Sequence, residues 1–138
     1  MRRNEPVSKI MTPNPTTVHF GQPLHEVQRA MAEQMCHHMP VVSGKKLVGM
    51  LSSTDLLRAS YEYGSDPRSA ETILDHTRSI QDVMTGSSLK TIKPTSTVRD
   101  AVEMFASGAF HALPVVDDEA LVGIVTTTDV MNYLLEQY

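Results

Sequence analysis

The feature that most constrains this chain is an internal duplication. Compared with itself at an offset of 74 residues, the chain is identical at nine of the nineteen positions that pair 37–55 with 111–129. Ordinary residue usage would give about one or two such identities. A further pair, Met11-Thr12 and Met84-Thr85, aligns at an offset of 73. The sequence therefore predicts a fold made of two similar units.

The two copies carry the same order of predicted elements. Apolar residues recur at helical spacing from Leu24 to Met35 and from Val98 to Phe105, and Pro23 fits the first turn of the earlier helix. Short β-branched runs between turn residues indicate buried strands. The other predicted elements are helical turns at 7–11 and 80–84, short strands at 16–19 and 90–92, strands at 39–42 and 113–116, return strands at 47–51 and 121–125, and final helices that open near 56 and 130.

Each copy is thus a β-α-β-β-α unit, and the expected class is α/β (α+β). A unit of about 50 residues makes too thin a core to be stable alone. We therefore expect the two units to pack about a pseudo-twofold axis. The predicted boundaries are 7–59 for the first unit, 60–78 for a polar linker and 79–137 for the second unit.

Composition and charge narrow the class of function. The net charge of −4 and the pI of about 5.8 disfavour a protein that mainly binds nucleic acid, because such domains usually carry a basic excess. A single cysteine, Cys36, excludes an internal disulfide and fits a reducing compartment. We see no signal peptide and no apolar run long enough to span a bilayer, so a cytoplasmic location is expected.

The segment Gly-x-x-[Ser/Thr]-x-x-Asp occurs twice, as 49–55 and 123–129. One interpretation is a capping box, in which a hydroxyl opens a helix and the acid three residues later bonds back to the backbone. A second interpretation is a ribose site, because a carboxylate can accept hydrogen bonds from two neighbouring hydroxyls. The two roles are compatible within one residue.

Six short motifs, three in each copy and in the same order within each copy, carry a resemblance to a known family. They are Ile10-Met11-Thr12-Pro13, Val83-Met84-Thr85, His37-x-x-Pro40-Val41-Val42, His111-x-x-Pro114-Val115-Val116 and the two Gly-x-x-[Ser/Thr]-x-x-Asp segments. The repeated unit resembles the cystathionine-β-synthase (CBS) domain, and the tandem resembles a CBS pair, or Bateman module. The resemblance covers the chain from about residue 7 to 135.

The resemblance implies a regulatory module that binds an adenosine nucleotide and has no catalytic role. The implied ligands are AMP, ADP, ATP or S-adenosylmethionine, bound in clefts between the units, with no cofactor. It further implies a homodimer and a regulated enzyme or transporter that is a separate chain. Apolar faces at Leu56-Leu57 and Val130-Met131-x-x-Leu134 are the predicted dimer interface.

The resemblance also implies two composite nucleotide sites. The first combines Ser52, Thr54, Asp55 and Arg58 with Thr85, Lys90, Ile92 and the segment Phe110-His111-Ala112-Leu113. The second combines Thr126, Thr128 and Asp129 with Thr12, Thr16, Val18 and the segment Cys36-His37-His38-Met39. Val18 or Ile92, with Met39 or Leu113 nearby, would form an apolar slot for adenine.

The two predicted sites differ in charge. Arg58 follows Asp55 by three residues, whereas Asn132 follows Asp129 at the same distance. Arginine can hold a phosphate through two hydrogen bonds, and asparagine cannot neutralise its charge. The Asp55 site is therefore expected to prefer the more phosphorylated ligand. The alternative is that Arg58 is an ordinary exposed helix charge.

Metal and catalytic sites are not predicted. Cys36-His37-His38 has no second cluster at ligand spacing, and strand alternation would point the two histidines to opposite faces. Two roles are therefore considered for His37, His38 and His111: contact with a ribose or phosphate, or a purely structural role. Cys36 has no evident acid partner, and no nucleophile elbow or glycine-rich phosphate loop is present.

Two other classes of function remain open at this point. The first is a ligand-free dimerisation or scaffold module, in which Asp55 and Asp129 only cap helices. The second is a nucleic-acid binder, which the acidic balance disfavours.

Overall fold

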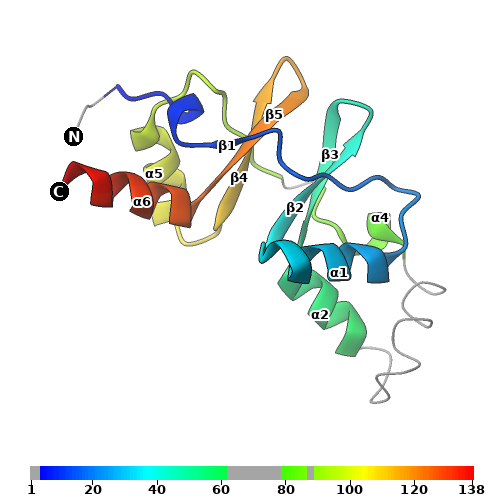
Figure 1. Ribbon diagram of the computed structural model, residues 1–138. Coiled ribbons are helices and arrows are strands. Elements are labelled where there is room, and N and C mark those ends of the chain that lie inside the picture. Colours follow the sequence, from blue (N-terminus) through cyan, green and yellow to red (C-terminus); the bar gives the residue numbers. More distant parts are fainter. Residues whose placement is uncertain (1–3, 62–78, 87–88) are drawn as a thin grey trace. The chain divides into compact units, whose positions relative to one another are not determined.

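The computed structural model describes residues 4–61, 79–86 and 89–138, which form two compact units (Figure 1). The Asp55 unit spans Thr16–Leu89, and the Asp129 unit combines Met1–Pro15 with Lys90–Tyr138. Both mix helices with antiparallel strands, which confirms the predicted α+β class. Nearly all of the predicted linker at 60–78 lies outside the described residues.

The Asp55 unit is a hairpin covered by helices. Its elements are α1 (Leu24–Gln34), β2 (His38–Ser43), β3 (Lys46–Ser52), α2 (Ser53–Tyr61) and α4 (Ile80–Val83). Strands β2 and β3 pair antiparallel, with Val41 opposite Gly49. Helix α1 buries Leu24, Val27 and Met31, whose three- and four-residue spacing places them on one face. The hydrophobic core thus lies between this face, the hairpin and α2.

The Asp129 unit repeats this arrangement. Its elements are η1 (Val7–Lys9), β1 (Thr12–Pro13), α5 (Val98–Ala106), β4 (Ala112–Asp117), β5 (Ala120–Thr126) and α6 (Thr127–Gln137). Strand β5 pairs antiparallel with β4 on one side and with β1 on the other. The core includes Val7, Ala101, Leu113 and Val125, all fully buried. The predicted hairpins and helices of both copies are confirmed.

The Met-Thr segment that opens each sequence repeat packs in the compact unit built mainly from the other repeat. Thr85 exchanges two backbone hydrogen bonds of 2.9 Å with Met50, and Thr12 pairs with Ile124. A Cβ added at Gly49 would lie 2.3 Å from Met84 Sδ, and one at Gly123 would lie 2.5 Å from Met11 Sδ. The glycine that opens each Gly-x-x-[Ser/Thr]-x-x-Asp segment therefore lacks a Cβ where the methionine side chain packs across the strand.

The strands predicted at 16–19 and 90–92 are wrong in extent. Each contributes one residue to a parallel bridge, Val18 with Val41 and Ile92 with Val115. The chain turns immediately afterwards, because the N–H of Gln22 bonds the carbonyl of His19 and that of Ser96 bonds the carbonyl of Lys93. These turns end the extended segments before a ladder can form.

Two details of the helices also correct the sequence analysis. Pro23 has an extended backbone and is the N-cap of α1, so it precedes the first helical turn. On the last helices, Leu56 and Val130 are core residues, with exposed fractions of 1% and 4%. Leu57, Met131 and Leu135 are exposed, so Leu57 and Met131 of the predicted dimer face lie on the surface, whereas Leu56 and Val130 do not. In the ranges that the structure describes, no helix is both long and apolar enough to cross a bilayer.

Candidate ligand site

Both aspartates of the repeated motif form capping boxes. The backbone N–H of Asp55 donates to Ser52 Oγ at 3.0 Å, and Ser52 N–H donates to Asp55 Oδ2 at 3.2 Å. The matching distances at Asp129 and Thr126 are 3.1 Å and 2.8 Å. Each carboxylate thus fixes the start of its helix with one oxygen. Because a carboxylate has about four acceptor positions, Oδ1 of each aspartate can still accept from a ligand.

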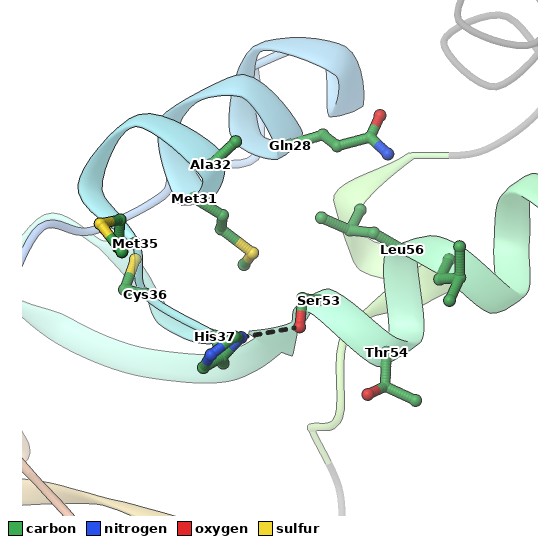
Figure 2. Close-up of a pocket in the computed structure, with 10 residues that line it drawn as sticks. Gln28, Met31, Ala32, Met35, Cys36, His37, Ser53, Thr54 and Leu56 are labelled. Carbon is green, nitrogen blue, oxygen red and sulfur yellow. Dashed lines mark hydrogen bonds between the residues drawn. The ribbon is translucent and has the colours of Figure 1, made fainter. Parts of the chain in front are cut away.

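The histidine of each repeat lies at the N-terminus of the helix that follows the return strand, α2 for His37 and α6 for His111. The N–H of Ser53 donates to the carbonyl of His37 at 2.8 Å, and that of Thr127 donates to the carbonyl of His111 at 3.0 Å. His37 Nδ1 also lies 3.5 Å from Ser53 Oγ (Figure 2). The sequence did not predict this contact, although the histidine and the Gly-x-x-[Ser/Thr]-x-x-Asp motif are equally spaced in both copies.

The predicted site residues divide evenly between the units. The Asp55 unit contains Thr16, Val18, His37, His38, Met39, Ser52, Thr54, Asp55, Arg58 and Thr85. The Asp129 unit contains Thr12, Lys90, Ile92, Phe110, His111, Ala112, Leu113, Thr126, Thr128 and Asp129. Thr85 lies in the compact unit of Asp55, and Thr12 lies in that of Asp129. The grouping of each aspartate with the strand segments of the other unit stays a prediction.

The four residues predicted to form an adenine slot are core residues. The exposed fractions of Val18, Met39, Ile92 and Leu113 range from 0% to 6%, and each belongs to the hydrophobic cluster of its own unit. Their side chains face the core, so a ligand at these positions would meet their backbone groups. Thr16 is exposed, and its hydroxyl donates to Gln34 Oε1 at 2.8 Å.

The charge difference between the two aspartates is visible in the structure. Arg58 Nη1 lies 4.0 Å from Asp55 Oδ1, and 70% of the Arg58 side chain is exposed. In α6, the equivalent position is the exposed Asn132. The carboxylate of Asp55 is therefore partly balanced by a neighbouring cation on its own helix.

An apolar pocket of about 540 Å³ lies between α1 and α2 of the Asp55 unit (Figure 2). The sequence did not predict this pocket, although the helical spacing of Met31 and Met35 indicated an apolar face. It is lined by Gln28, Met31, Ala32, Met35, Cys36, His37, Ser53, Thr54, Leu56 and Leu57. Ser53 and Leu57 are four residues apart and share a helix face, whereas Asp55 and Arg58 do not line the pocket.

Cys36 is partly buried beside this pocket, and burial raises the pKa of its thiol. A raised pKa keeps the thiol protonated and unreactive near neutral pH. Over the described ranges, the His, Cys, Asp and Glu side chains form no group of three that could hold a metal ion.

The repeat, the capped aspartates and the crossing methionines together define a tandem pair of small α+β units. The CBS domain family model matches residues 7–62 and 80–136, so the chain belongs to the CBS domain family, as a tandem pair.

Named relatives include enzymes and small proteins. The chain is 31% identical over 134 residues to homoserine O-acetyltransferase of Methanohalobium evestigatum, covering 96% of this chain and 24% of that enzyme. It is 28% identical to the CBS domain-containing protein YhcV of Bacillus subtilis, covering 89% of this chain and 81% of YhcV. The chain spans a quarter to a half of the first curated relatives, with 24% and 47% of their lengths.

Among solved structures, the chain is similar to CBSX2 of Arabidopsis thaliana in complex with AMP. The two share 27% identity with a TM-score of 0.80, over 96% of this chain and 98% of that one.

Proposed function

We propose that this protein is a regulatory module that binds an adenosine compound, namely AMP, ADP, ATP or S-adenosylmethionine. The observation that carries the proposal is the similarity over nearly the whole chain to CBSX2, which was solved with AMP. The capped aspartates supply a matching chemistry, because each carboxylate is held at a helix N-terminus.

The proposed contacts follow from the charges at these helix starts. Asp55 or Asp129 accepts hydrogen bonds from the two ribose hydroxyls through the oxygen directed away from the cap. The exposed Thr54 and Thr128 lie in the first helical turn, where the helix dipole favours an anion. We therefore propose that, where the bound ligand carries a 5′-phosphate, this phosphate lies beside the threonine of that site.

The module acts on a partner and has no catalytic role of its own. Burial raises the pKa of the Cys36 thiol, so this thiol does not suit a nucleophile. We infer that ligand binding signals to a regulated enzyme or transporter. The similarity to a quarter of homoserine O-acetyltransferase, an enzyme, supports this inference.

We also propose a homodimer. Helices α2 and α6 expose apolar side chains, with exposed fractions of 53% at Leu57, 58% at Met131 and 72% at Leu135. Burial of such residues against a second copy removes apolar surface from water, which stabilises the assembly.

The test of adenosine binding separates a ligand contact from a helix cap. Asp129→Ala removes a cap and the proposed ribose acceptor, whereas Asp100→Ala removes only a cap, because Asp100 forms the same capping box with Thr97 in α5. We expect each substitution to cost about 1 kcal/mol of stability. Calorimetric titration with AMP, ADP, ATP and S-adenosylmethionine should show weaker binding of at least one compound for Asp129→Ala and unchanged binding of all four for Asp100→Ala.

Two outcomes of this titration count against the proposal. Equal affinities of both variants for all four compounds would show that Asp129 only caps α6. Absence of binding for all four compounds in the unaltered protein would favour the scaffold alternative.

A further inference from the structure

We propose that Arg58 makes the Asp55 site selective for adenosine compounds that carry a phosphate. The Asp129 site, with Asn132 in the equivalent position, then favours adenosine compounds without one. This inference rests on the proposed function, and it names the residue that decides which ligand each aspartate accepts.

The position of Arg58 on α2 is the first support. Arg58 follows Asp55 by three residues, so the two side chains lie on the same helix face. The guanidinium is 4.0 Å from Asp55 Oδ1, the oxygen that does not accept the cap hydrogen bond from Ser52. A ligand held by this oxygen through its ribose therefore lies within reach of the guanidinium.

The exposure of Arg58 is the second support. At 70% exposure its side chain is free to turn toward a ligand, and a solvated ion pair at 4.0 Å holds it only weakly. A guanidinium has five N–H donors in a planar fork, which match two oxygens of a phosphate. The exchange of a weak carboxylate contact for a two-point phosphate contact favours phosphorylated ligands.

The contrast with Asp129 is the third support. Asp129 bonds Thr126 in the same way that Asp55 bonds Ser52, so the two carboxylates have matching cap geometry. Within the part of the chain that the structure describes, no ion pair involves Asp129, and Asn132 provides no positive charge. An uncompensated carboxylate repels a phosphate and attracts a cation such as a sulfonium.

The experiment compares adenosine with AMP and ATP, by calorimetric titration of the full chain. The variants are Arg58→Ala, which removes the guanidinium, and Asn132→Arg, which adds one at the equivalent position. Arg99→Ala is the matched control, since Arg99 is 75% exposed and pairs with Glu103 on α5. Thermal unfolding checks that every variant remains folded.

We expect Arg58→Ala to weaken AMP and ATP binding by about tenfold or more, because it removes charge-assisted hydrogen bonds to phosphate. The affinity for adenosine should stay within about twofold of that of the unaltered protein. Asn132→Arg should strengthen AMP binding, and Arg99→Ala should leave the binding of adenosine, AMP and ATP unchanged. The inference is overturned if Arg58→Ala weakens adenosine and AMP equally, or weakens neither. If adenosine, AMP and ATP all fail to bind the unaltered protein, the inference fails; the proposed function fails as well if ADP and S-adenosylmethionine also do not bind.

Discussion

At the scale of single residues, two glycines and one cysteine show how a side chain's surroundings decide its role. Gly49 and Gly123 open the repeated motif, and each accommodates a methionine thioether where a Cβ would otherwise lie. Cys36 is the only cysteine of the chain and lies in a partly buried, apolar place.

Alanine at either motif glycine should destabilise its unit. In Gly123→Ala the new methyl group would lie 2.9 Å from the carbonyl oxygen of Thr12 and 2.5 Å from Met11 Sδ, so backbone as well as side chain must move. We expect a loss of about 1–3 kcal/mol, measured by urea unfolding. Gly21→Ala is the control, because a Cβ there meets nothing within 4 Å. Similar losses in the two variants would contradict the close crossing of Met11 over β5.

The raised pKa of Cys36 predicts slow alkylation near neutral pH. Burial disfavours the thiolate, so the pKa lies above its ordinary value of 9.0 and the reactive fraction appears only as pH rises. Because the chain has one cysteine, uptake of iodoacetamide measured by mass reports this thiol alone. The folded protein should react more slowly than the urea-unfolded protein at pH 8. Equal rates would contradict the burial of Cys36.

At the scale of elements, local pattern predicted the helices and hairpins well. Leu24, Val27 and Met31 share the face predicted by their spacing, and β2 and β4 form where β-branched runs occur. The short strands at 16–19 and 90–92 were overestimated, because nearby turns limit each to one bridge. Leu56 and Leu57 were both predicted to lie in the dimer face, but Leu56 faces the core, because adjacent leucines do not reveal which one is buried.

The exposed apolar side chains of the last helices lead to a prediction about the whole molecule. If Met131 and Leu135 lie in a homodimer interface, Met131→Glu and Leu135→Glu should each shift the mass measured by light scattering toward the monomer. A charge buried at an interface without a partner is strongly unfavourable. Gln137→Glu adds the same charge to the same helix at an exposed position and should leave the mass unchanged. A dimeric mass for both α6 variants would exclude this face.

At the scale of the whole molecule, the sequence repeats and the compact units do not coincide. The family model matches 7–62 and 80–136, whereas the compact units are Thr16–Leu89 and a combination of Met1–Pro15 with Lys90–Tyr138. Val7, at the start of the first repeat, is fully buried in the cluster that contains Leu113 and Val125 of the second. The N-terminal segment is therefore part of the core of the Asp129 unit.

The sequence by itself determined the duplication, the order of elements, the capping boxes and the family. These depend on identity at a fixed offset and on contacts between residues three or four apart, which local spacing reveals. Only the tertiary structure decided that Met84 crosses Gly49, that Met11 crosses Gly123, and that Val18 and Leu113 face the core. Periodicity shows which residues share a face, but the partner of that face is chosen by packing between segments distant in the chain.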